Sequence, residues 1–489
     1  MAGRTRGAAA RLLELVERGD AALGQQLERL VVAHHARRLR RLGHGRALSA
    51  PAGGWASAGP PPRQGNRVDV HVDGAAAFAE IAAAIEGARS SVWLAGWFFS
   101  PDFRLQAGQT TTLRELLAEA AERVEVRLLA WAGAPLPLFR PDRDEVRTVR
   151  EALSEGTRVR VALDSRERPL HCHHEKLVII DGEVAFVGGL DLTTCSADRL
   201  DTNEHPARDS LGWHDATSRI SGPAVVDVAE HFRLRWQEVT GEHLPALPAP
   251  GPAGEVELQV VRTVPEKIYR RLGRGEFTIL ESYLRALRAA EKLIYLENQF
   301  LWSPEIVTVL AEKLRHPPNE RFRLLVLLPV KPNTGNDDTR GQLGVLAAAD
   351  DDAGRFLACT LYQPGPNGRP VYVHAKIGIV DDRWLTIGSA NLNEHSLFND
   401  TEMNMVTHDV ALAKATRLDL WSEHLQRPVA ELDRDPAEVI DELWRPLAIE
   451  QFERRRQDQP LTHKLLLLPH VSRRASALRG PISSVLVDG

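Results

Sequence analysis

The hydrophobic and polar positions of residues 66–430 form two kinds of segment that alternate along the chain. Segments with apolar residues at helical spacing are separated by short, almost wholly apolar segments, which are typical of strands buried on both faces. The first part of the chain predicts helices over 75–88, 113–122 and 144–155 and strands over 91–98, 124–131 and 159–163. A later part predicts helices over 278–290 and 305–314 and strands over 293–300, 322–328 and 356–362. This alternation favours an α/β fold.

The same short motif, His-x-Lys-x4-Asp, follows each of these two parts. It occupies residues 174–181 and again residues 374–381. In each copy the histidine and the lysine, two residues apart, project from one face of a strand. The apolar run and the aspartate after them predict a hairpin, with returning strands over 183–187 and 384–387. The repeat therefore predicts two pseudo-twofold related halves with one shared active site, each half a mixed, mostly parallel sheet flanked by helices.

The pattern divides the chain into four parts. Residues 1–65 form a basic amphipathic arm and linker, 66–250 the first half, 251–430 the second half, and 431–489 a C-terminal segment that packs on the body. In the arm, apolar residues recur at helical spacing at Leu12, Val16, Leu23, Leu27, Leu30 and Val31. An arginine-rich stretch follows, so the arm is either attached to anionic lipid or a helix that is solvated or packs on another part of the protein.

Composition narrows the class of protein. The chain has 489 residues, 43% hydrophobic and 26% charged, with a net charge of −5, which describes a globular protein and disfavours a nucleic-acid binder. Three cysteines cannot form a disulfide framework and indicate a reducing compartment. No apolar run approaches the ~20 residues of a membrane-spanning helix, and no secretory signal is visible. We expect a cytoplasmic protein, with peripheral contact to a membrane left open.

The duplicated motif indicates phosphodiester chemistry. Two histidines that meet at one phosphorus atom provide a nucleophile and a general acid. Lys176 and Lys376 would supply positive charge to the phosphoryl oxygens, and Ser389 and Asn391, which follow the second motif, would donate hydrogen bonds. This chemistry requires no metal or other cofactor. A zinc site made by consecutive residues 171–173 (His-Cys-His) is disfavoured, because successive strand residues point to opposite faces.

With these residues in place, the sequence resembles the phospholipase D superfamily, and within it the phosphatidylcholine-type enzymes of eukaryotic style. The resemblance covers about residues 66–430. It is carried by residues 173–181, 186–192, 213–215, 295–300, 374–381, 388–391 and 400–402, with a further similarity at 478–482. Residues 193–211 differ from the aromatic-rich version expected for the family, and we expect them to shape the substrate mouth.

The resemblance implies the fold of that superfamily and a role for each matched residue. His174 would be the nucleophile that forms a phosphohistidine, and His374 the acid and base. Lys176, Lys376 and Asn391 would bind the phosphoryl oxygens, and Asp191 stands where the first half keeps the counterpart of Asn391. Asp215 and Glu402 would orient the imidazoles. Ser389 and Gln299 complete the supporting set. Asp181 and Asp381 complete the catalytic motifs, although their spacing alone predicts turn residues.

The expected function is hydrolysis of a glycerophospholipid at a membrane surface to phosphatidic acid and a headgroup alcohol. Water or a primary alcohol would be the acceptor, since a covalent intermediate can be intercepted by either. Three alternatives stay open: a cardiolipin synthase-like phosphatidyltransferase, a nuclease, which the acidic balance disfavours, and a non-catalytic membrane-surface protein on the same scaffold.

Overall fold

A computed structural model describes residues 26, 28–135, 140–168, 171–195, 199–332, 336–366 and 368–469, with the backbone alone for 336–338. The sequence predictions for Leu12, Val16, Leu23 and Leu27 and for the tail at 478–482 fall outside these residues. Within the described residues, no helix is both long enough and apolar enough to cross a bilayer.

The first half is built on a seven-stranded mixed sheet. Its order is β4-β3-β2-β5-β6-β8-β1. The strands are β1 (Arg63–Val72), β2 (Ser91–Gly96), β3 (Glu125–Trp131), β4 (Arg160–Asp164), β5 (Leu177–Ile180), β6 (Val184–Gly188) and β8 (Ala216–Ser221). The helices of this half are α3 (Gly74–Glu86), α4 (Leu113–Ala121), α5 (Arg143–Ser154) and α6 (Val225–Thr240).

The second half repeats this order strand for strand as β13-β12-β11-β15-β16-β17-β9. These strands are β9 (Val256–Val264), β11 (Leu293–Glu297), β12 (Arg323–Leu327), β13 (Phe356–Tyr362), β15 (Ile377–Val380), β16 (Trp384–Gly388) and β17 (Glu402–Thr407). The helices are α7 (Thr278–Ala289), α8 (Pro304–Arg315), α9 (Asn336–Asp350) and α10 (Val410–Leu425).

Shorter elements connect the halves and extend the second sheet. The strand β14 (Pro370–Val373) pairs with β13 and, across the halves, in parallel with β7 (Gly212–His214). β10 (Glu276–Phe277) pairs with β9, and β1 also pairs with β9. Near the C-terminus, β18 (Leu465–Leu467) pairs with β13. The remaining elements are α2 (Gly45–Leu48), η1 (Arg270–Leu272), η2 (His395–Asn399), α11 (Val429–Leu432), α12 (Pro436–Val439), η3 (Ile440–Trp444) and α13 (Arg445–Arg456).

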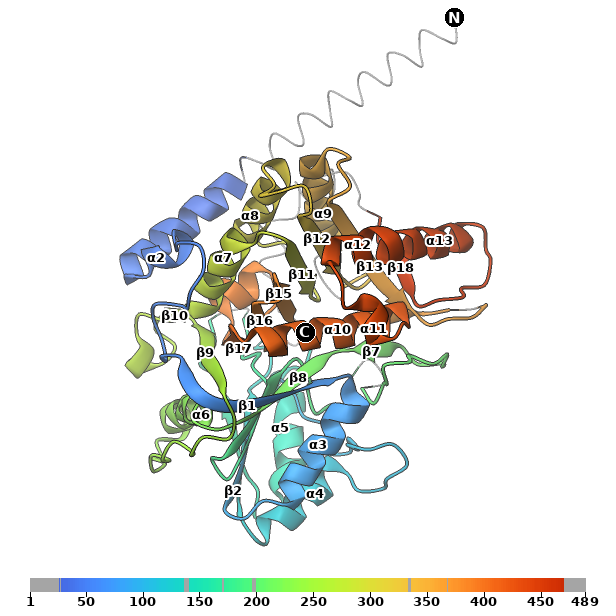
Figure 1. The fold of residues 1–489 in the computed structure, drawn as a ribbon. Helices are drawn as coiled ribbons and strands as arrows, with labels where there is room; N and C mark the ends of the chain where they lie inside the picture. Colours follow the sequence, from blue (N-terminus) through green and yellow to red (C-terminus); the bar gives the residue numbers. More distant parts are fainter. Residues whose placement is uncertain are drawn as a thin grey trace, which may run out of the picture.

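The two sheets face one another across a central core, with helices on their outer faces (Figure 1). Side chains of β2 alternate accordingly: Trp93 and Ala95 enter the central core, whereas Val92 and Leu94 pack on the outer face. The helices α6 and α10 contribute Phe232, Trp236 and Trp421 to the central core. Burial on both faces explains why the strands read as nearly continuous apolar runs.

The α/β class is confirmed. Within the two seven-stranded sheets, β2-β3-β4 and β11-β12-β13 pair in parallel and all other pairs are antiparallel. The expectation of mostly parallel sheets thus holds only for three strands of each half. The reason is that each motif starts a hairpin: Asp181 and Gly182 both have positive φ, as do Asp381 and Asp382, which suits tight turns between antiparallel strands.

The described part of the N-terminal arm packs on the second half. A helix over residues 28–42 buries Leu39 fully and places His35 Nδ1 2.7 Å from Glu305 Oε1. Arg38 pairs with Glu266 at 2.6 Å, whereas Arg37, Arg40 and Arg41 are exposed. Of the two interpretations of the arm, packing applies to this stretch.

Candidate active site

Each motif histidine lies on the loop that leads into its strand, and the other half holds that loop by its backbone. The amides of His174 and Glu175, just before β5, donate to the carbonyl of Thr401 at 2.9 and 3.1 Å. The amides of His374 and Ala375, just before β15, donate to the carbonyl of His214 at 2.7 and 3.1 Å. The matching bonds show that the pseudo-twofold relation of the sheets extends to the motifs.

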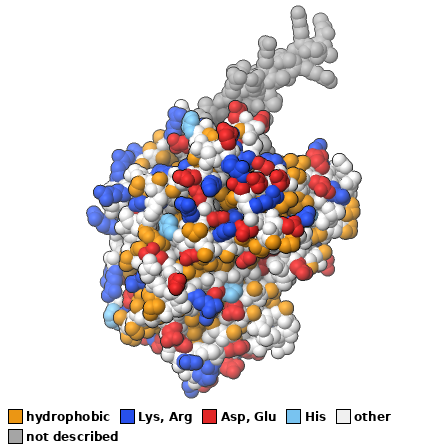
Figure 2. Space-filling model, viewed as in Figure 1, with side chains coloured by type: hydrophobic (Ala, Val, Ile, Leu, Met, Phe, Trp, Pro, Cys, Tyr) orange, Lys and Arg blue, Asp and Glu red, His pale blue; other side chains and the backbone are white. Residues whose placement is uncertain are grey.

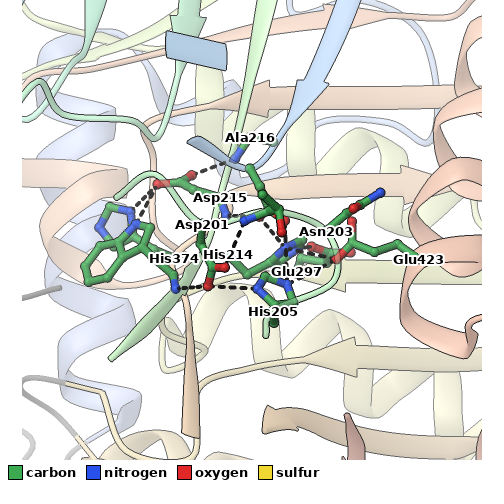
Figure 3. Close-up of polar contacts among 12 residues, drawn as sticks. Asp201, Asn203, His205, His214, Asp215, Ala216, Glu297, His374 and Glu423 are labelled. Carbon is green, nitrogen blue, oxygen red and sulfur yellow. Dashed lines mark hydrogen bonds and ion pairs between the residues drawn. The ribbon is translucent and has the colours of Figure 1, made fainter. Parts of the chain in front are cut away.

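The residue that follows each of these carbonyls is a carboxylate that contacts the histidine. His174 Nδ1 lies 2.9 Å from Glu402 Oε1. His374 Nδ1 lies 2.6 Å from Asp215 Oδ2, and Figure 3 shows this second pair. Both carboxylates are completely buried. Each half therefore supplies the carboxylate that orients the imidazole of the other half, and contact at Nδ1 leaves Nε2 as the nitrogen for chemistry.

The two lysines have related but unequal surroundings. Lys176 Nζ lies 3.3 Å from Asp191 Oδ2, so the first lysine has a carboxylate partner. Lys376 Nζ donates to Gln299 Oε1 at 3.2 Å, and the Asn391 amide donates to the same oxygen at 3.3 Å. In the second half, the ammonium of Lys376 and the amide of Asn391 thus share one glutamine oxygen. Among the described residues, no carboxylate offsets the charge of the ammonium at that point.

The two orienting carboxylates also differ. The hydroxyls of Ser389 and Ser396 both donate to Glu402. At the position equivalent to Ser389 the first half has Gly189, where an added Cβ would lie 2.1 Å from Asp215 Oδ1. The sequence difference between Gly-Gly and Gly-Ser therefore corresponds to two different ways of holding a buried carboxylate.

Burial and crowded positive charge control protonation in the site. Burial lowers the pKa of His374 well below its usual value, and the charges of Lys376, Arg199, Lys176 and His174 lower it further. Burial also lowers the pKa of Lys376 to about 7. Burial raises the pKa of Glu402 well above its usual value and raises that of Asp215. Because charges from both halves act on His374, the two motifs belong to one electrostatic site.

Asp181 and Asp381 do not join this cluster, which corrects their placement among the catalytic residues. They lie at the far ends of the motif strands β5 and β15. Asp181 accepts hydrogen bonds from the amides of residues 89–91, and Asp381 from those of residues 291–293. Both carboxylates therefore anchor the chain where β2 and β11 begin, in keeping with the turn role that spacing alone suggested.

Arg199 is a site residue that sequence reasoning missed. Its guanidinium lies 3.6 Å from the centre of the Trp213 ring, and its Nη1 is buried without a hydrogen-bond partner. Its charge lowers the pKa of both His374 and Asp215. The one available signal was its place in the segment 193–211, which differs from the family pattern. That segment also contains Arg208, and the spacing does not show which of the two arginines reaches the site.

Behind the His374–Asp215 pair lies a buried network that joins the halves (Figure 3). His214 has its Nδ1 2.9 Å from Asp73 and its Nε2 2.7 Å from Glu297, and His205 lies 3.0 Å from Asp201. Neighbouring Asp73 and Glu297 raise the pKa of His214 well above its usual value, although burial opposes them. The network borders a cavity of about 650 Å³ lined by Asp73, Asn203, Asp419 and Glu423, among others.

Four residues of this network have the donor types of a divalent-cation site. Ligand atoms of Asp73, His205, His214 and Glu423 all lie within 4.8 Å of one another. However, Lys464 Nζ lies 3.4 Å from Glu423, and both nitrogens of His214 already contact carboxylates. A metal there would have to displace a proton from His214, so the arrangement suits a network of charged side chains at least as well.

The fold and site define a class of protein: a duplicated α/β protein in which two His-Lys pairs share one site. Comparison with known proteins agrees. Residues 350–422 match the family model "Cardiolipin synthase, PLD-like domain". The chain is 27% identical to phospholipase D A of Dictyostelium discoideum, over 75% of this chain and 36% of that protein. It is 26% identical to phospholipase D alpha 4 of Arabidopsis thaliana, over 70% of this chain and 62% of that protein.

A bacterial relative has a different name. The chain is 26% identical to the major cardiolipin synthase ClsA of Bacillus subtilis, over 74% of this chain and 72% of that protein. Four eukaryotic phospholipases D, including the two above, are matched over only 36% to 62% of their own lengths. The family model and these relatives together support assignment of the chain to the phospholipase D superfamily.

Proposed function

We propose that the protein is a phospholipase D. It hydrolyses the distal phosphodiester of glycerophospholipids to phosphatidic acid and a headgroup alcohol, and it transfers the phosphatidyl group to primary alcohols. The observation that supports this most is the exchange of carboxylates, in which Glu402 contacts His174 and Asp215 contacts His374 at Nδ1. Two imidazoles oriented in this way, with two buried lysines beside them, suit nucleophilic and acid–base catalysis at one phosphorus.

In the proposed reaction, neutral His174 attacks phosphorus through Nε2 while protonated His374 donates its proton to the leaving oxygen. The P–O bond breaks and a P–N bond forms. Neutral His374 then accepts a proton from water or an alcohol, whose oxygen attacks phosphorus and breaks the P–N bond. Lys176, Lys376 and Asn391 stabilise the charge on the phosphoryl oxygens throughout.

The lowered pKa of His374 bears on its role as an acid. Burial is the largest cause of this lowered pKa, and the positive charges of Lys376 and Arg199 are the next largest. A phosphodiester carries a negative charge, so its binding offsets these cations and raises the pKa of His374. Protonation of the general acid is thus coupled to substrate binding in this proposal.

The test is turnover of phosphatidylcholine vesicles in the presence of ethanol. We expect phosphatidic acid and phosphatidylethanol from the purified protein, and losses of at least about 10³-fold in His174→Asn and in His374→Asn. The exposed His316 provides the control variant His316→Gln, which should keep full activity. Retained turnover in both active-site variants would remove the mechanism, and no product from the wild-type protein would reject the proposed substrate.

Cardiolipin synthesis is the second candidate. It is favoured by the description of the matched family model and by the name of the Bacillus relative, which is covered over most of its length. The same site would then transfer a phosphatidyl group to a lipid alcohol. Incubation with phosphatidylglycerol alone separates the two: cardiolipin as the main product supports the synthase, and phosphatidic acid supports the phospholipase.

A further inference from the structure

Three polar side chains from both halves meet beside the proposed reaction site and take no part in it. They are His171, on the loop before β5, His395, the first residue of η2, and Asp400, directly after η2. His171 Nδ1 lies 3.1 Å from His395 Nδ1 and 3.3 Å from Asp400 Oδ1. His395 and Asp400 are completely buried, and the His171 side chain is 11% exposed.

These separations match those between ligands of one metal ion. Zinc binds imidazole nitrogen and carboxylate oxygen at about 2.0–2.2 Å in tetrahedral geometry, which places neighbouring ligand atoms roughly 3.3 Å apart. The two imidazole nitrogens lie at hydrogen-bond distance from each other. A cation bound between them and the carboxylate would replace that hydrogen bond by coordination of both nitrogens.

A second observation also indicates a ligand. Asp400 Oδ1 accepts a hydrogen bond from the amide of Cys172 at 2.9 Å, but Oδ2 has no hydrogen-bond partner although the side chain is completely buried. An unpaired buried carboxylate oxygen costs free energy unless something satisfies it. A metal ion held by the neighbouring imidazoles would do so.

The surrounding charges are compatible with a cation. Arg168 is the positive group that acts on His171, and it lies 3.4 Å from Glu266, which offsets part of its charge. The Trp302 ring stacks on His395, with centroids 6.1 Å apart.

We propose that His171, His395 and Asp400 bind a divalent transition-metal ion of the zinc class, with a fourth position for water. One ligand comes from the first half and two from the second. Asp400 is adjacent to Thr401, whose carbonyl holds the amide of His174. The ion would therefore fasten the halves together at the His174–Glu402 pair without touching substrate. This site is distinct from the residues 73, 205, 214 and 423 described above, and the proposal is independent of the reaction.

The test is metal binding by the full-length protein after treatment with a chelator. We expect the wild type to bind one equivalent of Zn²⁺ more than His395→Gln or Asp400→Asn does. In His171→Gln we expect the affinity for this equivalent to fall at least about 10-fold. Co²⁺ should give the visible absorption bands of a tetrahedral nitrogen and oxygen site in the wild type and lose them in these variants. His316→Gln is the matched control and should bind like the wild type.

Glu423→Gln separates this site from the other cluster. It should leave the equivalent that depends on His171 unchanged, whereas loss of that equivalent in Glu423→Gln alone would overturn the proposal. Equal Zn²⁺ stoichiometry and affinity in the wild type and His171→Gln would also overturn it. Because the His171 side chain is partly exposed, we expect His171→Gln to fold even if the buried substitution His395→Gln prevents folding. Circular dichroism of each variant checks this.

Discussion

At the scale of single residues, position relative to buried charge decides what each motif side chain can do. The two motifs share the pattern His-x-Lys-x4-Asp, yet Lys176 faces the carboxylate of Asp191 and Lys376 faces the amide oxygen of Gln299. The partner of Lys376 carries no charge, so burial is opposed only by the more distant charges of Asp215, Glu402 and Asp191. Its protonation therefore changes near neutral pH.

This difference predicts an alkaline limb in the activity profile. The pKa of Lys376 is about 7, so its positive charge is present below pH 7 and is lost as the pH rises above it. We expect kcat/KM for phospholipid hydrolysis to fall above about pH 7, since this ratio reports groups of the free enzyme. In Lys376→Arg the guanidinium stays charged, so the limb should disappear although the overall rate is lower. The exposed Lys331 offers the control Lys331→Arg.

An unchanged limb in Lys376→Arg would assign the titration to another group. His374 is the alternative, but its pKa is lowered, so its deprotonation would set a limit at lower pH in the free enzyme. The position of the limb on the pH axis therefore distinguishes the two residues.

At the scale of elements, the motif strand carries chemistry at one end and structure at the other. In the second half the histidine and lysine precede β15, and Asp381 follows it, where its carboxylate accepts three backbone amide bonds of 2.7 Å each. These bonds fix residues 291–293, where β11 begins. The spacing that the two motifs share thus places the reactive side chains at one end of the strand and the anchoring aspartate at the other.

We expect Asp381→Ala to lower the free energy of unfolding by about 1–3 kcal/mol, since it removes the charged acceptor of three backbone amides, including that of the buried Leu293. Its kcat/KM at a temperature where it is folded should equal that of the wild type. Urea unfolding and lipid turnover on the same preparation measure both quantities. The exposed Asp102 provides the control Asp102→Ala, for which we expect a change within about 0.5 kcal/mol. A large loss of kcat with unchanged stability would restore Asp381 to the catalytic residues.

At the scale of the whole molecule, the site exists only because the halves exchange contacts. The β7–β14 pair, the bonds to the Thr401 and His214 carbonyls, and the network around His214 all cross between the halves. On the face shown in Figure 2, acidic and basic side chains are interspersed. The division at residues 65, 250 and 430 stays a prediction, and β1, which pairs with strands of both halves, shows how closely the parts are joined.

The His214 network predicts how stability depends on pH. Because the folded pKa of His214 lies well above 6.5, its contribution to stability is fully present below about pH 6.5 and is lost as the pH rises through the folded value. We expect His214→Gln to cost about 3–5 kcal/mol at pH 6, because it removes the buried positive charge that contacts both Asp73 and Glu297. The cost should shrink as the pH increases.

Chemical denaturation over a pH series measures this difference. The exposed His243 offers the control His243→Gln, whose free energy of unfolding should follow that of the wild type at every pH. A cost of His214→Gln that does not vary with pH would show that the network is stabilised by hydrogen bonds alone.

The sequence by itself determined the features that depend on neighbours along the chain. The predicted strands and helices followed from local apolar periodicity, whereas β1, β8, β9, β17, α6, α9 and α10 were not among them. The hairpin after each motif followed from turn residues such as Asp181 and Gly182. The repeat identified both histidines and both lysines, because a duplicated pattern at matched offset is a strong signal. Asp215 and Glu402 were identified through the family resemblance.

Only the tertiary structure decided which residues meet across the halves. It assigned Glu402 to His174 and Asp215 to His374, brought Arg199 into the site, moved Asp181 and Asp381 out of it, and placed His171 beside His395 and Asp400. These contacts join residues 14 to more than 200 positions apart, such as Arg199 with Trp213 and His174 with Glu402. Local propensity contains no information about such pairings, because they are formed by packing of the two sheets and not by the conformation of either segment.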